Sequence, residues 1–408
     1  MVLPRRLVLT LPLILASTAY PAEFPGFEPQ TLDPHVGNVC YAVTTADVNG
    51  DGKLDAVAVA EDAVYWYANP SWQKQTIIKN ATEKDNVCIQ AHDIDGDGKI
   101  DFSLGASWQP SNTKSGGTIQ WLRRGGDDSW SVAPIGSEPT VHRMRWGDVL
   151  GVGKKQLVVA PLQGRGTKGP NWGAGNGVRI LVYTVPADPL KDKWTFEVAD
   201  DSLHATHNFQ LVDLNNDGKV EIVVASWEGV FVLQSEGKGQ WEKRRLGTGN
   251  QSSSPSKGSS EVKVGKFAGG LPYLATIEPW HGNQVVVYTM PSLKKTWDRH
   301  VIDEPVPWGH AVWCADLDGD GDDELVIGQR DPSKDPSRSP KGPGVLVYDL
   351  KPGLDPGSPP SFTRHVIDDG GIGCEDLVVA DLNSDGRPDI LAGGRSSHNV
   401  KVYWNRGR

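Results

Sequence analysis

The chain has 408 residues, and its 51 acidic against 41 basic side chains give a formal charge of -10 at pH 7. Nucleic-acid binding needs a basic face, so this balance argues against that class of partner. The 47 glycines and 29 prolines disfavour long helices and suit short strands joined by tight turns, while a hydrophobic content of 38% is enough for a packed core.

Residues 1–22 have the pattern of an export signal. Arg5 and Arg6 precede an apolar run at 7–16, and the small residues Ser17 and Ala19 follow it. This run is shorter than the roughly 18 apolar residues that a membrane span needs. We therefore expect a signal peptide at 1–22. The mature chain, 23–408, is then expected to be a secreted or periplasmic monomer without a membrane span.

A ten-residue acidic motif recurs along the chain and determines the expected fold. Clear copies lie at 46–55, 92–101, 212–221, 315–324 and 380–389, and degenerate copies lie at 147–156 and 265–273. Each repeat unit has room for four short strands, which in the sixth unit we place at 310–317, 324–328, 344–350 and 362–368. Seven such units predict an all-β fold, a seven-bladed β-propeller of four-stranded blades.

The two ends of the chain are expected to close this ring. The seventh unit stops after its third strand, VKVYWN, whereas FEPQTLD at 27–33 has the pattern of a fourth strand. We therefore predict that the N-terminal strand completes the last blade. The four cysteines, Cys40, Cys88, Cys314 and Cys374, allow three disulfide pairings in an oxidising compartment, and the sequence does not choose among them.

Five of the acidic turns follow the pattern D-x-[DN]-x-D-G-x-x-[DE]. Alternating oxygen-bearing side chains in a tight loop converge on one point, as calcium requires, and glycine supplies the bend. We expect structural calcium, without a role in catalysis, at these turns. The predicted ligands are Asp47, Asn49, Asp51 and Asp55; Asp93, Asp95, Asp97 and Asp101; Asp213, Asn215, Asp217 and Glu221; Asp316, Asp318, Asp320 and Glu324; and Asp381, Asn383, Asp385 and Asp389. Asx turns that bind no ion are the alternative.

A second set of residues is expected on the opposite face of the ring. Six residues before the first Asp of each repeat, where the innermost strand should begin, stand Tyr41, Val87, His142, His207, Ser260, His310 and Glu375. His142, His207, His310 and Glu375 are candidate ligands of a second divalent metal. Polar residues that merely hydrate a channel are the alternative.

The loops expected on that face carry further candidates. Glu278, Trp280 and His281 belong to one of them, and Arg395 to another. Long excursions at 164–177, which contains Trp172, and at 330–344 are expected there too. Tryptophan beside charged groups suits a sugar, so Trp172, Trp280, Arg395 and Tyr41 are candidate substrate-binding residues. Some of the tryptophans are expected to serve blade packing instead.

These motifs carry two resemblances. The acidic repeats resemble those of FG-GAP/VCBS propellers, which implies the fold and calcium. The strings VHRMRWGD, ATHNFQLVD, IEPWHGNQVVVYT and GHAVWCADLDGDG resemble the propeller domain of aldos-2-ulose dehydratases, which eliminate water from keto sugars. The chain is also similar in architecture to propeller-type polysaccharide lyases. The similarities to the dehydratases and to the lyases both imply a β-elimination.

The function that we expect is an exported carbohydrate-active lyase or dehydratase acting on a keto sugar or a uronate-containing glycan. His281 is the candidate base or acid, and Glu278 is expected to orient it. His142 is a catalytic candidate as a member of the metal-binding or substrate-polarising ring, and Arg143 is expected to neutralise developing charge. A non-catalytic propeller that binds glycan or protein is one alternative. A glycoside hydrolase that uses Glu278 and Glu375 is another.

Overall fold

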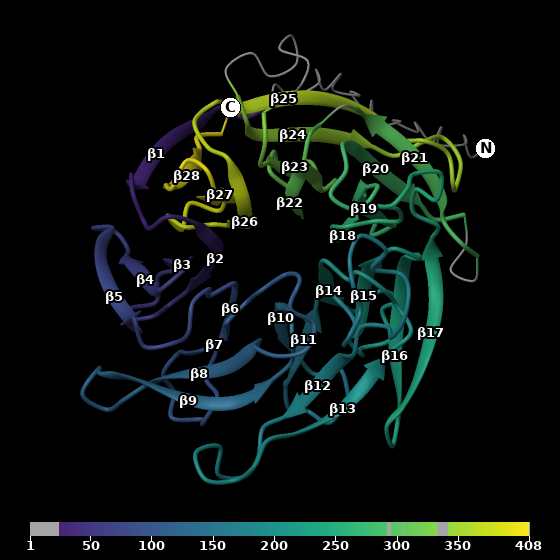
Figure 1. Ribbon diagram of the computed structural model, residues 1–408. Coiled ribbons are helices and arrows are strands. Elements are labelled where there is room, and N and C mark those ends of the chain that lie inside the picture. The colour runs from purple at the N-terminus through teal and green to yellow at the C-terminus, as the bar shows by residue number, and fades with distance from the viewer. Residues whose placement is uncertain (1–23, 292–294, 305, 333–341, 408) are drawn as a thin grey trace, which may run out of the picture.

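The computed structural model describes residues 24–291, 295–304, 306–332 and 342–407. Their strands form seven four-stranded antiparallel sheets arranged as the blades of a ring (Figure 1), which confirms the predicted seven-bladed β-propeller. The predicted signal peptide and part of the 330–344 loop lie outside the described residues. Nowhere in the described ranges is there a helix long and apolar enough to cross a membrane.

Strands are numbered in chain order, and blades one to six each contain four consecutive strands. Blade one consists of β2 (Cys40–Ala46), β3 (Asp55–Ala60), β4 (Ala63–Ala68) and β5 (Gln73–Lys79). Blade two consists of β6 (Cys88–His92), β7 (Asp101–Ala106), β8 (Thr118–Arg124) and β9 (Trp130–Ser137). Blade three consists of β10 (Val141–Gly147), β11 (Gln156–Pro161), β12 (Ile180–Thr184) and β13 (Thr195–Asp200). Blade four consists of β14 (Phe209–Val212), β15 (Glu221–Ser226), β16 (Gly229–Gly237) and β17 (Gln240–Gly247).

The remaining blades follow the same plan. Blade five consists of β18 (Val262–Lys266), β19 (Pro272–Glu278), β20 (Gln284–Thr289) and β21 (Asp298–Asp303). Blade six consists of β22 (Gly309–Ala315), β23 (Glu324–Gln329), β24 (Gly344–Lys351) and β25 (Ser361–Asp369). Its inner strand ends two residues before the predicted end at 317, because Asp316 already belongs to the acidic turn. Blade seven combines β26 (Cys374–Ala380), β27 (Asp389–Gly394) and β28 (Val400–Asn405) with β1 (Phe27–Asp33).

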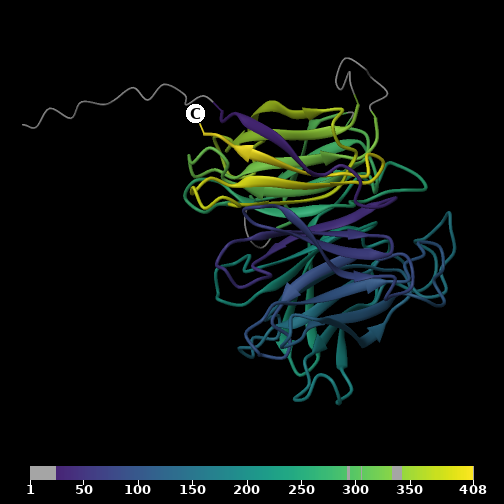
Figure 2. The ribbon, with the colours of Figure 1, turned by 90° about the vertical axis from the view of Figure 1, so that its left-hand side faces the viewer.

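The ring is closed by strands from the two ends of the chain, as predicted. In blade seven the strand order is β1-β28-β27-β26, and Phe27 pairs with Asn405 at the start of the antiparallel ladder between β1 and β28. Figure 2 shows this N-terminal strand, in purple, beside the yellow C-terminal strands. The pairing covers the edge that β28 would otherwise expose, so neither end of the ring is left open.

The core lies between the blades. Seven apolar clusters each combine side chains of two neighbouring blades, and the second strands β3, β7, β11, β15, β23 and β27 are buried along their full length. Both faces of a blade are therefore covered, and this is why these strands have continuous rather than alternating apolar patterns. The four cysteines, all within the described chain, are free.

Polar contacts also join neighbouring blades. A tyrosine on a third strand donates its hydroxyl hydrogen to an aspartate at the end of the preceding blade, at 2.7 Å in three places: Tyr67 to Asp33, Tyr348 to Asp303 and Tyr403 to Asp368. The fourth strands thus supply an acceptor for the next blade, from a VID ending at Asp303 and Asp368 and from TLD at Asp33. These contacts fix the blades rigidly around the centre, where the candidate site lies.

Candidate functional site

Four of the seven inner strands carry a β-bulge at the ring position identified in the sequence. The ladder register shifts so that the extra residue is Tyr41 in β2, His142 in β10, His310 in β22 and Glu375 in β26. A bulge leaves one residue unpaired and redirects its side chain. His207 is also outside the strand ladder, because it lies two residues before β14 begins.

The backbone before three of these histidines is left-handed. Thr140, Ala205 and Trp308 have φ values of 60°, 49° and 49°, and each stands two residues before His142, His207 or His310. Left-handed backbone is unfavourable for residues with a Cβ and is found preferentially at functional sites. The local turn therefore presents each histidine in a manner that ordinary strand geometry would not.

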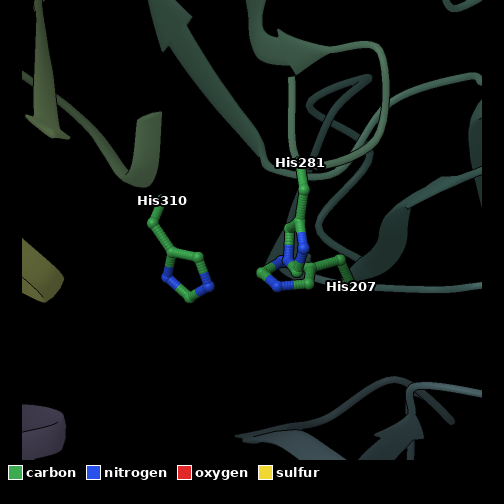
Figure 3. A group of neighbouring side chains, drawn as sticks. All are labelled: His207, His281 and His310. Carbon is green, nitrogen blue, oxygen red and sulfur yellow. The ribbon is translucent and has the colours of Figure 1, made fainter. Parts of the chain in front are cut away.

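Four histidines from different blades meet at the centre of the ring. Ring centroids lie 4.6 Å apart for His142 and His207, 4.8 Å for His207 and His310, and 4.5 Å for His207 and His281. His281 comes from the β19–β20 loop and stacks between Trp280, at 4.0 Å, and Trp308, at 5.0 Å. Figure 3 shows His207, His281 and His310 converging, and one ligand nitrogen of each lies within 4.8 Å of the others.

The hydrogen bonds of these rings determine which nitrogen faces the cluster. His207 Nδ1 donates to Glu261 Oε1 at 2.5 Å, and His310 Nδ1 donates to the Glu375 carbonyl oxygen at 2.7 Å. The Nε2 atom of each ring is then left with its lone pair. Among the described residues, His207 Nε2 and His281 Nε2 are buried without a hydrogen-bond partner. Buried polar atoms are normally satisfied, so these nitrogens suit a metal ion or a bound ligand.

The environment keeps the four imidazoles neutral. Burial lowers the pKa of His142, and the adjacent Arg143 guanidinium lowers it further. Burial also lowers the pKa values of His207, His281 and His310, with added repulsion from neighbouring histidines and from Arg330. Desolvation disfavours the charged imidazolium, and only the neutral ring can accept a proton or bind a metal.

Glu261 is the principal site residue that the sequence search missed. It is fully buried, and its second oxygen accepts a 2.5 Å hydrogen bond from Asn208 Nδ2. Burial raises the pKa of Glu261 and lowers the pKa of the nearby Lys263. The positions directly after several ring residues carry a second set of polar side chains, and inspecting them would have identified Glu261. This set includes Arg143, Asn208, Glu261 and Asp376.

Two sequence expectations need correction. Glu278 does not orient His281, because its carboxylate is buried among Ser259, Thr276 and Tyr288 and forms a 2.7 Å ion pair with Arg299. Its place is structural, inside the blade, so it also cannot pair with Glu375 as a hydrolase would need.

The expected ligand set of His142, His207, His310 and Glu375 is also different. His281 joins His207 and His310, whereas His142 Nδ1 donates to the His207 carbonyl oxygen at 2.9 Å and Glu375 pairs with Arg395 at 2.8 Å. Counting positions along the inner strands could not identify His281 as a member of this ligand set, because His281 lies in the loop between the second and third strands of its blade.

The predicted substrate-binding residues are only partly brought together. Trp280 contacts His281 and His207, and the Arg395 guanidinium lies 5.4 Å from the Tyr41 ring centroid. Tyr41 itself packs edge-on against Trp108, which contacts His142. Trp172 instead lies over Gly169 of its own loop, and no ring contact joins it to the histidines among the described residues.

The acidic turns lie at the other ends of the inner strands. In the first turn Asp47 Oδ1 accepts the backbone N–H groups of Gly50 and Asp51, while both oxygens of the buried Asp55 accept backbone N–H groups. Ligand oxygens of Asp93, Asp95 and Asp101, and of Asp316, Asp318 and Asp320, lie within 4.8 Å of one another. Burial raises the pKa of Asp101 and of Asp389 to about 6.

The degenerate turn of blade three has the same local fold. Asp148 accepts the backbone N–H groups of Val152 and Gly153, and Gln156 accepts that of Leu150. The turn thus forms around backbone hydrogen bonds even where most of the acidic side chains are missing. A single aspartate and one polar side chain at the ninth position are enough for this conformation.

The fold and the repeats define the class of protein. The chain folds as a seven-bladed propeller, and the family model described as an FG-GAP-like repeat matches residues 47–104. The family model described as "Aldos-2-ulose dehydratase, beta-propeller domain" matches residues 116–291. This segment contains His142, Arg143, His207, Glu261 and His281. The resemblances to FG-GAP propellers and to the dehydratase propeller domain are thereby confirmed.

A curated protein adds to this relationship. The aldos-2-ulose dehydratase of Phanerodontia chrysosporium is 29% identical over 238 residues, which is 52% of this chain. The matched part is 25% of that protein's length, so this chain corresponds to a fraction of its relative.

Solved structures share the fold alone. A BBS1N–ARL6DN complex has a TM-score of 0.54 at 12% identity, with 94% of this chain and 97% of that chain covered. An Agrocybe aegerita lectin that recognises non-reducing terminal N-acetylglucosamine has a TM-score of 0.51 at 14% identity, with 90% and 85% covered.

Proposed function

We propose that the chain is a sugar dehydratase or lyase that performs a β-elimination at the histidine cluster. The observation that carries this proposal is the pair of buried, unpartnered nitrogens of His207 and His281 beside the neutral His142 and the cationic Arg143. Buried polar atoms are normally satisfied, so these nitrogens are available to a bound ligand or metal. Similarity to the dehydratase propeller supports the same reaction class.

His207, His281 and His310 fit a divalent transition metal. Neutral imidazoles are good ligands for zinc and its neighbours, and three of them leave a coordination position open. Glu261 holds His207 in the tautomer that directs Nε2 to the site, and the Glu375 carbonyl oxygen does the same for His310. A bound ion of this kind polarises a substrate carbonyl oxygen as a Lewis acid.

His142 is the better candidate for the general base. Its Nδ1–H is engaged by the His207 carbonyl oxygen, so the Nε2 lone pair is the one that remains. His142 is neutral at pH 7 because burial and Arg143 lower its pKa, and a neutral imidazole can take the proton next to a carbonyl group. Arg143 stabilises the negative charge that then develops.

The five acidic turns are proposed as structural calcium sites. Each turn carries alternating oxygen donors. The oxygens that lie close together in the turns of blade two and blade six support an ion at these positions. They lie at the far ends of the inner strands, away from the histidines, so calcium would brace the blades and take no part in the elimination.

The test is an elimination assay with keto sugars and with glucuronate-containing glycans as separate substrate sets. We expect an unsaturated product that absorbs in the near ultraviolet, and its loss in His142→Gln and after removal of transition metals. If no substrate gives such a product while the His142→Gln and His281→Gln variants bind glycans like the unaltered protein, the chain is a binding module instead.

A further inference from the structure

Arg143 is a buried cation without a matching anion. Its exposed fraction is 4%, and its Nη1 donates to the backbone carbonyl oxygen of His142 at 3.1 Å. The same Nη1 lies 3.4 Å from His142 Nε2, which is a long contact for a hydrogen bond. The Nε atom is buried without a partner among the described residues.

The other cations around the histidines are better satisfied. Arg395 forms a 2.8 Å ion pair with Glu375, and Arg330 pairs with Asp331 at 3.2 Å. Arg145 donates to the Asn208 side chain at 3.2 Å. Within the described ranges Arg143 and Arg145 both lack a carboxylate in direct contact, but Arg145 donates to an amide side chain, whereas Arg143 donates only to a backbone carbonyl and keeps a buried Nε without a partner.

Burial raises the pKa values of Glu261 and Asp376 and the charge of Arg143 lowers them, but both groups already serve other partners. The two oxygens of Glu261 accept hydrogen bonds from His207 and Asn208, and Asp376 Oδ2 accepts one from the Val43 backbone. A buried charge without a direct counter-ion is costly, and a protein retains one where a ligand completes it. Arginine presents a planar fork that matches a carboxylate with two hydrogen bonds.

We propose that Arg143 is the carboxylate-binding residue of an anion subsite, and that the substrate is an acidic sugar rather than a neutral one. This inference rests on the proposed function and specifies its substrate class. The indole N–H groups of Trp108 and Trp280 are also buried without partners in the described part of the chain. Both rings contact histidines of the cluster, so the site offers further donors to an oxygen-rich ligand.

This geometry couples substrate binding to the activation of His142. When a carboxylate accepts hydrogen bonds from the Arg143 guanidinium, Arg143 Nη1 no longer contacts His142 Nε2. The lone pair of that nitrogen is then free to accept a proton. His142 Nε2 then takes the proton from the carbon that bears the carboxylate. The electrons of that C–H bond form the new C=C bond, and the C–O bond at the adjacent carbon breaks. The leaving oxygen takes the proton that His142 Nε2 has removed and departs as water or as a sugar hydroxyl, which returns His142 to its neutral form.

The experiment compares ligands that differ only in the carboxylate. Methyl glucuronoside and methyl glucoside, and a glucuronate-containing oligosaccharide with its carboxyl-reduced form, are titrated calorimetrically into the full chain. We expect each acid to bind roughly 10- to 100-fold more tightly than its neutral counterpart, as a charge-assisted bidentate contact predicts.

Three variants show whether Arg143 is responsible. Arg143→Gln should remove the preference while leaving the affinity for the neutral sugar unchanged, and Arg143→Lys should keep only part of it. Arg406→Gln, at an exposed ion pair with Glu28, is the matched control and should bind like the unaltered protein. Equal affinity for acid and neutral sugar, or a preference that survives in Arg143→Gln, overturns the inference.

Failure of this inference is distinguishable from failure of the proposed function. Elimination from neutral keto sugars by the unaltered protein, without any preference for acids, removes the acidic substrate and leaves the dehydratase. An Arg143-dependent preference for acids without any unsaturated product leaves the anion subsite and removes the elimination.

Discussion

The two faces of the propeller use polar side chains in opposite ways. On the turn face, Asp47 and Asp55 accept backbone N–H groups of their own turn, so each carboxylate is satisfied close to its place in the sequence. At the centre of the other face, His207 and His281 come from different blades and leave buried nitrogens without partners within the described ranges. The first turn is thus built from local hydrogen bonds, whereas the histidine cluster is assembled from distant parts of the chain and keeps nitrogens that a ligand can use.

The largest expected effect separates the two faces by activity. His142→Gln should lower the rate of elimination roughly 10²- to 10⁴-fold, because the general base is lost. His365→Gln, on the outer strand β25, is the control and should retain the rate. The rate is measured from the unsaturated product. A His142→Gln variant as active as the control would show that the base is elsewhere.

Acid should destabilise the histidine face. The folded pKa values of His142, His207, His281 and His310 lie well below the ordinary value of 6.5, so the unfolded chain binds more protons as the pH falls. Stability from these groups is fully present above pH 6.5 and should fall below it, by up to about 1.4 kcal/mol per pH unit for each histidine. Urea denaturation of protein freed of transition metals measures this slope. A slope unchanged in His142→Gln would contradict the contribution of that ring.

Calcium should act on the turn face alone. If the turns bind calcium, an excess of about 100 times the dissociation constant stabilises the fold by about 2.7 kcal/mol per site. Thermal denaturation with and without a calcium chelator should show this shift, and Asp93→Asn should reduce it. Asp148→Asn, in the degenerate turn, should leave the calcium dependence unchanged. Equal calcium dependence in both variants would argue against selective binding at the acidic turns.

A smaller effect is expected from the residue that orients His207. Glu261→Gln should weaken transition-metal binding roughly 10- to 100-fold, because a supporting carboxylate fixes the ligand tautomer. Metal titration followed by equilibrium dialysis gives this affinity without an activity assay. Glu228→Gln is a close match, since Glu228 accepts from His204 Nδ1 at 2.9 Å outside the cluster, and it should bind metal normally.

The sequence search found the ring histidines because they recur at a fixed distance from each acidic motif. It did not find Glu261, and it assigned Glu278 to His281 because the two are only three residues apart. In the structure Glu278 ends strand β19 and points into the blade beside Tyr288, while His281 has left the strand through a turn with φ of 50°. Nearness in sequence says little about side chains on either side of such a turn.

The sequence by itself determined the number of blades, the strand that closes the ring and the positions of the acidic turns, because these depend on local patterns repeated along the chain. Only the tertiary structure decided which histidines meet, which nitrogen each presents and which cation lacks a counter-ion. Bulges and left-handed residues at the starts of the strands change the directions of individual side chains. The regular spacing of the repeats in the sequence does not predict these directions. The centre of the ring then joins residues more than 100 positions apart, such as His142 and His281.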